Sequence, residues 1–128
     1  MQEEHGLEFQ RIKTVGDLDR VLADASSRGK SAMLDFYADW CVTCKEMERF
    51  TFSDPGVQAR MAQMLLLQTD VTASAPEHLA LLKRFRLFGP PGIIFFDRAG
   101  REIDGLRVIG FQPAEEFAAV LDRALAPR

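Results

Sequence analysis

The apolar positions of the chain alternate between helical spacing and short continuous runs. A capping-box pattern at residues 14–17 precedes apolar residues at helical spacing, which predicts a helix that ends near Gly29. Residues 32–38 are apolar on both faces except at Asp35, which is typical of a buried strand in a parallel sheet. Helix-forming residues follow at 45–52. The first half of the chain therefore predicts a helix, a buried strand and a second helix.

The second half of the chain continues this alternation. Asp54 and Pro55 are typical of an N-cap and a first helical residue, and they predict a short helix through about Ala62. Residues 64–69 form a second apolar strand, and residues 74–77 repeat the capping-box pattern ahead of another helix. The apolar residues of that helix are Leu79, Leu82 and Phe85.

The remaining apolar runs complete the expected fold. Residues 93–96 predict a third strand that ends in a turn, and residues 107–111 predict a fourth. Pro113 begins a closing helix, and residues 8–12 form a weak first strand. The short link around Gly100 indicates an antiparallel hairpin. Because strands alternate with helices, we expect an α/β fold with a central mixed β-sheet flanked by helices on both faces.

Length and composition restrict the class of protein. The 128 residues fit a single domain, which spans residues 1–128. We expect the protein to be a monomer and residues 1–7 to be disordered. A net charge of −3 argues against nucleic-acid binding, which needs a cationic surface. The longest uncharged apolar stretch, residues 87–96, is too short to insert across a bilayer. The first residues also lack the features of a signal peptide.

The two cysteines form a single Cys-x-x-Cys motif, Cys41 and Cys44. Two cysteines cannot build a disulfide framework or a four-cysteine metal site. A zinc site would have to recruit both His5 and His78, which lack the usual zinc-ligand spacing, and Lys45 stands where haem attachment needs histidine. We therefore expect no metal and no cofactor other than a redox-active Cys41–Cys44 disulfide.

The position of the motif suits dithiol–disulfide exchange. Cys41 follows a buried strand and begins a helix, where free backbone N–H groups stabilise a thiolate. Cys44 lies one turn further on the same face and can break a mixed disulfide formed at Cys41. We therefore expect Cys41 to be the nucleophile and Cys44 the resolving thiol. The alternative is an inert disulfide, although a bridge over so short a loop restrains little chain entropy.

Residues 35–45 resemble the active-site segment of the thioredoxin superfamily, with Trp40 before the first cysteine and Lys45 after the second. Residues 88–96 resemble the second signature of that family, in which a proline opens a strand opposite the cysteines. The resemblance extends over nearly the whole chain, because the order of elements also fits. It implies a thioredoxin-like fold and a protein-disulfide reductase activity.

A narrower resemblance concerns residues 37–48, 51–55 and 67–72, which are similar to the C-terminal domain of the DsbD family. That resemblance implies the periplasmic domain of a bacterial inner-membrane thiol:disulfide interchange protein, so the chain is expected to be an excised domain. It implies electron transfer from the transmembrane domain to the N-terminal domain of the same protein. That relay supports disulfide isomerisation and cytochrome c maturation.

Two carboxylates are expected beside the cysteines. Asp35 matches the buried acid of the thioredoxin family, and it could accept the proton of Cys44. Glu48 lies on the helical face of the cysteines and matches an active-site glutamate of the DsbD domain. Negative charges at Asp35 and Glu48 are expected to raise the pKa of Cys41 until a partner docks. The alternatives are a satisfied buried polar group for Asp35 and an ordinary solvated residue for Glu48.

A substrate groove is expected from the same resemblance. Pro91 matches the cis-proline of the family, although an arbitrary X–Pro bond is usually trans. A cis bond presents the backbone of Pro90 to an extended substrate. Gly92 replaces a threonine that is frequent in the family. Trp40 is expected to border the groove, and Phe88 to be exposed for docking, whereas the sequence leaves Tyr37 open between core and active-site shield.

Two other functions remain open at this level. One is a free cytoplasmic thioredoxin-type reductase. The other is a thioredoxin-fold docking or metal module whose cysteines do not turn over. Whether the cysteine pair reduces or oxidises its partners depends on its redox potential, which does not follow from the residue pattern.

Overall fold

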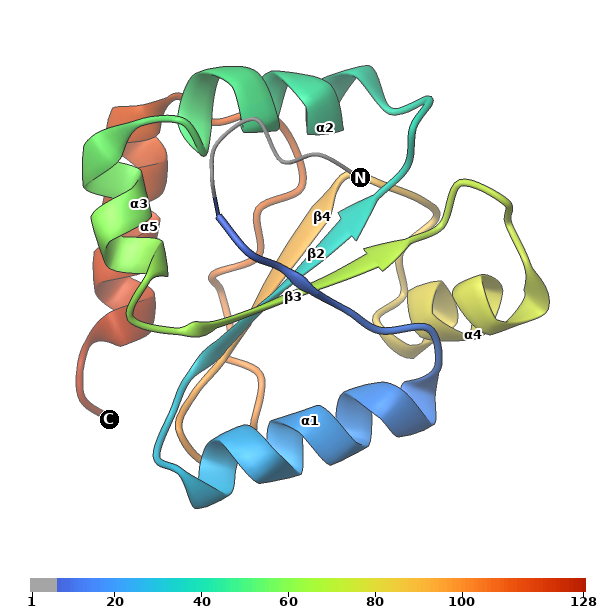
Figure 1. Ribbon diagram of the computed structural model, residues 1–128, viewed down its shortest axis with the longest axis horizontal. Helices are drawn as coiled ribbons and strands as arrows, with labels where there is room; N and C mark the ends of the chain where they lie inside the picture. The colour runs from blue at the N-terminus through green and yellow to red at the C-terminus, as the bar shows by residue number, and fades with distance from the viewer. Residues whose placement is uncertain (1–6) are drawn as a thin grey trace.

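A four-stranded sheet with helices on both faces forms the centre of the computed structural model, which describes residues 7–128 (Figure 1). The elements are β1 (Gln10–Arg11), α1 (Val15–Ser27), β2 (Ala32–Tyr37), α2 (Val42–Glu46), the π-helical turn η1 (Met47–Thr51), α3 (Pro55–Met61), β3 (Leu65–Asp70), α4 (Pro76–Arg84), β4 (Gly92–Phe96) and α5 (Ala114–Leu125). Six of the residues expected to be disordered, 1–6, lie outside the described part. Leu7 packs against the core.

The sheet is mixed, as the sequence predicts. Its strand order is β1-β3-β2-β4, with β2 parallel to β3 and antiparallel to β4. Asp35 on β2 lies opposite Gln68 on β3 and opposite Ile93 on β4. Residues that are paired across neighbouring strands point to the same face, so these three side chains share one face of the sheet.

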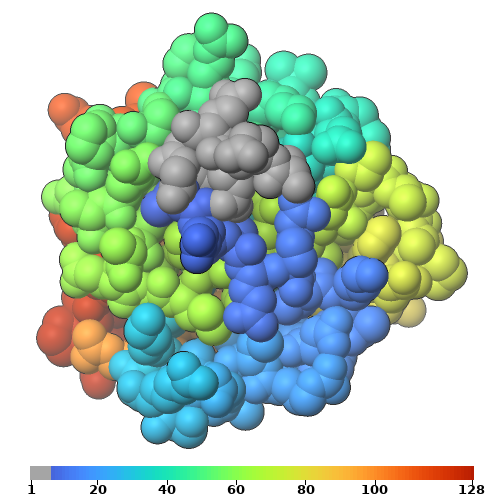
Figure 2. Space-filling model, viewed as in Figure 1, coloured from blue at the N-terminus to red at the C-terminus, as the bar shows by residue number. Residues whose placement is uncertain are grey.

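Two apolar clusters cover the two faces of the sheet. All six residues of β2 are buried, and at residues 32–34 successive side chains alternate between the two clusters. Leu34 and Phe36 join the cluster that contains core residues of α1 and α4, whereas Met33 joins the cluster of η1, α3 and α5. Figure 1 shows α1 and α4 on one side of the sheet and α3 with α5 on the other. In the same view, Figure 2 shows α1 in blue along the lower edge and the segment around α2 in turquoise along the upper edge.

The helix starts that the sequence predicts at Thr14 and Asp54 are confirmed. The Thr14 side chain accepts the backbone N–H of Asp17 at 3.0 Å, and the Asp17 carboxylate accepts the backbone N–H of Thr14 at 3.1 Å. The Asp54 side chain accepts the backbone N–H of Val57 at 3.0 Å. Gly29 follows α1 with a φ of 67°, a left-handed conformation that suits a residue without Cβ.

The capping box expected at residues 74–77 is wrong by one residue. Ser74 has a φ of 52°, and Ala75 is the N-cap of α4. His78 completes the cap because its Nδ1 accepts the backbone N–H of Ala75 at 3.1 Å. Of the three apolar residues that the sequence assigns to this helix, Leu82 and Phe85 are buried and Leu79 is 54% exposed.

The strand expected at residues 107–111 is also wrong. Only Val108 pairs with the sheet, where it exchanges two backbone hydrogen bonds of 2.9 and 3.0 Å with Ile93. Ile109 and Phe111 are exposed, so this segment offers no continuous apolar face that a longer pairing would bury. The antiparallel hairpin expected around Gly100 is reduced to a turn and two isolated antiparallel bridges, Phe96 with Glu102 and Ile93 with Val108.

The helix expected at residues 45–52 is interrupted. Its first part is α2, and from Met47 the chain continues as the π-helical turn η1. The Thr51 hydroxyl donates to the backbone carbonyl of Gln112 at 2.6 Å, and the Gln112 N–H points at Met47 Sδ at 3.4 Å. These two contacts bind η1 to the segment before α5. Turns of this kind occur preferentially at functional sites.

The capping box of α1 gives a test of the fold. We expect Thr14→Ala to lower the free energy of unfolding by about 1 kcal/mol, because one backbone N–H loses its partner. Urea unfolding of the variant measures this change. Thr14→Ser keeps the hydroxyl and serves as the matched control. Equal losses in both variants would show that the methyl group, and not the cap, stabilises this end of the helix.

Candidate active site

The Cys41–Cys44 disulfide lies at the junction between the end of β2 and the start of α2. The Cα atoms of the two cysteines are 5.3 Å apart, and each residue is only 5% exposed. Cys41 is the N-cap of α2, and its Sγ accepts the backbone N–H of Cys44 at 3.1 Å. Cys44 Sγ lies 3.7 Å from the carbonyl oxygen of Phe36. The two sulfur atoms are therefore equally buried but have different neighbours, a backbone donor for Cys41 and a strand carbonyl for Cys44.

Asp35 is a buried carboxylic acid next to this junction. It precedes Phe36, the residue whose carbonyl lies beside Cys44. Burial raises the pKa of Asp35 to about 7. A hydrogen bond of 3.0 Å from Gln68 Nε2 to Asp35 Oδ2 lowers this pKa, and so does the charge of Arg11. The charge of Glu48 raises it further. Asp35 is thus able to exchange a proton near neutral pH.

Glu48 is 8% exposed, although it belongs to a turn close to the surface. Its charge acts on Asp35, so the two acids that the sequence expected beside the cysteines lie near each other. Glu48 sits in η1, the turn that Thr51 and Met47 fasten to Gln112. The sequence alternative, a solvated residue at position 48, is therefore wrong.

Tyr37 closes β2 beneath the loop that leads to Cys41. It is fully buried, which decides between the two alternatives that the sequence left open in favour of core packing. Its hydroxyl donates to Asp39 Oδ1 at 3.0 Å and accepts a short hydrogen bond from Lys45 Nζ. Burial raises the pKa of Tyr37. The lysine after the second cysteine is therefore tied to the strand before the first one.

Trp40 is 57% exposed and is held at its indole nitrogen. Trp40 Nε1 donates to the backbone carbonyl of Thr72 at 3.2 Å, and the backbone N–H of Asp39 donates to Thr72 Oγ1 at 2.8 Å. Thr72 in turn donates its backbone N–H to Asp70 Oδ1 at 3.0 Å. The loop after β3 therefore positions the loop before Cys41, and more than half of the Trp40 surface stays exposed.

The Pro90–Pro91 peptide bond is cis, as the family resemblance implies. Gly92 pairs with Phe36 at the end of β2, so the two prolines lie at the same edge of the sheet as the cysteines. A Cβ at Gly92 would approach Leu87 Cδ1 to 2.9 Å. The side chain of Leu87 therefore occupies the space that the frequent threonine of the family would need.

Phe88 is fully exposed, as the sequence predicts. It lines a shallow groove of about 370 Å³ that lies along α4, with Leu79, Leu82, Lys83, Arg86 and Leu87. Phe88 is therefore grouped with the helix before the proline loop, and no contact that we describe joins it to the cysteines.

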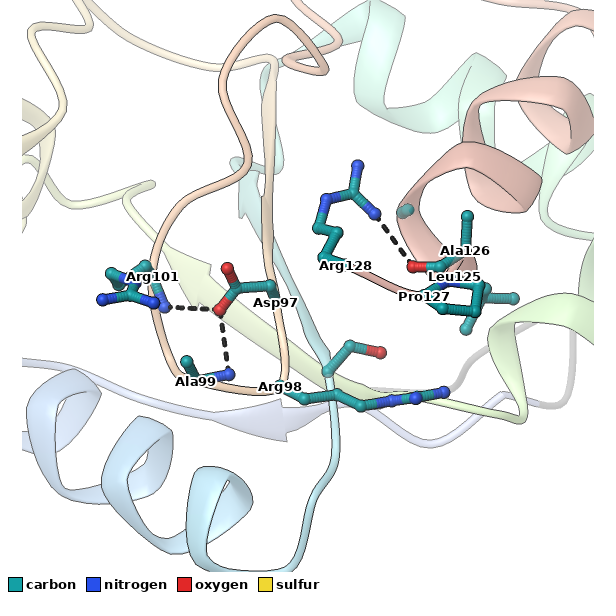
Figure 3. A pocket seen from close by; sticks show the side chains of 10 residues that line it. Asp97, Arg98, Ala99, Arg101, Leu125, Ala126, Pro127 and Arg128 are labelled. Atoms are coloured by element: carbon teal, nitrogen blue, oxygen red, sulfur yellow. Dashed lines mark hydrogen bonds between the residues drawn. The ribbon is translucent and has the colours of Figure 1, made fainter.

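The cavity in Figure 3 lies at the other end of the sheet. It has a volume of about 410 Å³, and its lining comes from the turn after β4 and from the end of α5. Asp97 Oδ1 accepts the backbone N–H groups of Ala99 and Arg101 at 2.9 and 3.0 Å, and Arg128 donates to the carbonyl of Ala126 at 3.0 Å. These polar groups serve the turn and the helix end, so the cavity is separate from the redox chemistry.

Residues 7–128 contain no group of three or more histidine, cysteine, aspartate or glutamate side chains that could hold a metal ion. Within the same range, none of the helices has the length and apolar character needed to cross a membrane.

Comparison with protein families agrees with the geometry. A family model described as a thioredoxin-like domain matches residues 18–125. The fold, the Cys-x-x-Cys disulfide at the start of α2 and the cis-proline at the same sheet edge define a thioredoxin-like thiol–disulfide oxidoreductase.

Comparison with individual proteins identifies a smaller family within this class of oxidoreductases. The chain is 55% identical over 120 residues to the thiol:disulfide interchange protein DsbD of Ralstonia nicotianae, an alignment that covers 94% of this chain and 20% of that protein. The C-terminal domain of Neisseria meningitidis DsbD matches in its oxidised form with a TM-score of 0.72 and 38% identity, over 85% of this chain and 90% of that domain. Its reduced form matches with a TM-score of 0.76 and 36% identity, over 88% and 97%.

The chain therefore belongs to the family of DsbD C-terminal domains. It spans about a fifth of the length of the curated relatives that it matches.

Two residues of this site were not expected from the sequence. Gln68 interrupts the second apolar strand, and a polar residue in such a run is the signal that points to it. Thr72 lies in an ordinary polar loop, and its role depends on the folding of β3 beside β2. By contrast, Cys41 and Cys44 are marked by their own motif, and Asp35 by its place in a buried strand together with the family resemblance.

The raised pKa of Asp35 makes stability depend on pH. The folded chain keeps this proton up to about pH 7, whereas the unfolded chain loses it near its ordinary pKa of 3.8. The contribution of Asp35 to stability therefore falls as the pH rises through this range and stays low above it. We expect the free energy of unfolding of Asp35→Asn, relative to the parent, to increase between about pH 4 and pH 8.

Urea unfolding of the oxidised proteins measures this difference, because a closed disulfide does not titrate. Asp104→Asn makes the same chemical change at an exposed position and serves as the control. A difference between Asp35→Asn and the parent that is constant with pH would contradict the raised pKa.

Proposed function

We propose that the chain is a reductant relay, in which Cys41 and Cys44 pass electrons by dithiol–disulfide exchange from a membrane domain to a periplasmic partner domain. The observation that supports this most directly is the pair of cysteines at the N-terminus of α2, with different neighbours for the two sulfur atoms. The exchange itself supports disulfide isomerisation and cytochrome c maturation through later partners.

Cys41 acts as the nucleophile. In the reduced protein its thiolate attacks one sulfur of a partner disulfide, forms a mixed disulfide and releases the other partner sulfur as a thiolate. The backbone N–H of Cys44 lies at 3.1 Å from Cys41 Sγ and stabilises the attacking anion. Cys44 then attacks Cys41 Sγ, which closes the internal disulfide and releases the second partner thiolate. Two electrons pass to the partner in these steps.

The two buried acids regulate these steps. Asp35 accepts the proton of Cys44 as that thiol attacks, which a carboxyl with a pKa of about 7 can do near neutral pH. Asp35 and Glu48 in their charged forms oppose a second negative charge at Cys41. The free domain therefore holds Cys41 back until a docked partner screens these charges.

The partner docks on the exposed surface around Cys41. The side chains of Trp40 and Val42 are 57% and 71% exposed on either side of this cysteine. Pro90 presents its backbone to an extended partner segment at the same edge of the sheet, and Phe88 adds an apolar contact at the end of α4. Backbone pairing of this type accepts partners of different sequence.

The proposed partners are other thiol–disulfide proteins, namely the N-terminal and transmembrane domains of the same DsbD chain. The domain itself works in the periplasm and does not insert in the membrane. The relatives that carry the name DsbD are about five times as long as this chain, which leaves room for both partner domains. No metal or organic cofactor takes part.

The assignment of the two cysteines can be tested by trapping. We expect reduced Cys44→Ala, treated with glutathione disulfide, to release glutathione and to accumulate a mixed disulfide at Cys41, because no thiol remains to resolve it. Cys41→Ala is expected to react at least about tenfold more slowly, since Cys44 lies against the Phe36 carbonyl. Mass spectrometry of the intact variants counts the adducts over time.

The outcomes separate the candidate functions. Faster accumulation in Cys41→Ala than in Cys44→Ala would reverse the assigned roles. A parent protein that fails to exchange with glutathione or dithiothreitol would support a docking module. Exchange that is unaffected by the partner domains would favour a free thioredoxin-type reductase.

The restraint by the two acids predicts a change in thiolate formation. In a Cys44→Ala background, we expect Asp35→Asn with Glu48→Gln to shift thiolate formation at Cys41 to lower pH by about one pH unit, because two nearby negative charges are removed. The ultraviolet absorbance of the thiolate measures the titration. Asp104→Asn with Glu115→Gln changes two exposed acids and serves as the control. An unchanged titration in the first pair would refute the restraint.

A further inference from the structure

Gln68 is a buried side chain that the mechanism above leaves without a role. It is 1% exposed and lies on β3 opposite Asp35 of β2. Its Nε2 donates to Asp35 Oδ2 at 3.0 Å. Its Oε1 is also buried and accepts no hydrogen bond from the residues that the structure describes. The NH₂ group of the amide therefore donates to Asp35, and its carbonyl oxygen is a second group that can act as an acceptor.

The surroundings of Asp35 offer few other polar groups. From β4 the opposing residue is Ile93, which has no polar group in its side chain. The charges that act on Asp35 are Glu48 from η1 and Arg11 from β1, and they have opposite signs. Gln68 donates the one hydrogen bond to the Asp35 side chain that we describe.

An amide suits a partner that changes its protonation state. Its NH₂ group donates to a carboxylate, and its carbonyl oxygen accepts from a carboxylic acid. A half-turn about the terminal side-chain bond exchanges the two groups without moving the backbone. A lysine at this position would favour only the charged acid, and an aliphatic residue would favour only the neutral acid. A glutamine amide can therefore form a hydrogen bond with either form of the acid.

We propose that Gln68 is a positioning residue of the exchange reaction, whose amide holds the Asp35 carboxyl group in place in both of its protonation states. In the resolving step the Cys44 thiol gives its proton to the Asp35 carboxylate, and the Cys44 thiolate attacks Cys41 Sγ of the mixed disulfide. The Cys41–Cys44 bond forms, the bond from Cys41 to the partner sulfur breaks, and the partner leaves as a thiolate. Gln68 donates to the carboxylate before the transfer and accepts from the carboxylic acid after it. This inference rests on the proposed function, because it takes Asp35 as the proton acceptor.

The test compares substitutions that act in opposite directions. We expect Gln68→Met to raise the pKa of Asp35 by about one pH unit, because the charged form loses its donor. Gln68→Lys is expected to lower it, because a cation then faces the carboxylate. NMR titration of the Asp35 carboxyl carbon in the reduced protein measures both shifts. Gln63→Met makes the same change at an exposed position of the loop after α3 and is expected to leave the titration unchanged.

The second readout is the pH profile of exchange. The oxidation rate of each reduced variant by glutathione disulfide is followed through the fluorescence of Trp40, the single tryptophan. Support for the proposal is an inflection of the rate that moves upward in Gln68→Met, downward in Gln68→Lys, and disappears in Asp35→Asn. A purely structural role of Gln68 would lower stability without moving this inflection.

The failures are distinguishable. An Asp35 titration that neither Gln68 variant shifts overturns the inference, while exchange by the parent leaves the proposed function intact. A shifted titration with an unmoved rate inflection also overturns it, because Asp35 is then not the proton acceptor. A parent that does not exchange at all refutes the proposed function itself. If Gln68→Lys does not fold, Gln68→Met alone decides, since it conserves the volume of the side chain.

Discussion

The burial of one carboxylic acid in the middle of the sheet is the constraint on which the active site depends. Asp35 lies in a strand whose six residues are all buried, and an isolated charge there costs several kcal/mol. The protein reduces that cost in two ways, by raising the pKa of Asp35 to about 7 and by pairing it with the amide of Gln68. The raised pKa follows from burial, and the pairing with Gln68 follows from the register of β2 with β3.

The π-helical turn brings a second acid to the same place. Glu48 is buried in η1, and its charge adds to the forces that keep Asp35 protonated. This arrangement needs the anchoring of Thr51 on the carbonyl of Gln112, a contact between parts of the chain 61 residues apart. A segment far from the cysteines in sequence therefore helps to determine the charge beside them.

Local signals in the sequence predicted much of this molecule, and contacts over long range explain what they missed. The buried strand around Asp35 and the helix start at Asp54 are confirmed, because each depends on residues within a few positions. The strand expected at residues 107–111 fails, since alternating apolar residues there face solvent instead of a neighbouring strand. The role of Gln68 was not foreseen, because only the pairing of two strands places it opposite Asp35.

Two opposing influences act on Cys41 in the proposed exchange. The start of α2 stabilises an anion at Cys41 by about 1 kcal/mol, the order of magnitude typical of a helix N-terminus. A buried like charge nearby costs more than this, because the low dielectric of the interior weakens charge interactions much less than water does. In the proposed mechanism, repulsion by ionised Asp35 and Glu48 outweighs the helix and slows the reaction of the cysteine pair with disulfides that are not docked. A partner that covers Trp40 and donates hydrogen bonds to Cys41 Sγ stabilises the thiolate only while it is bound. The exchange reaction is therefore coupled to docking.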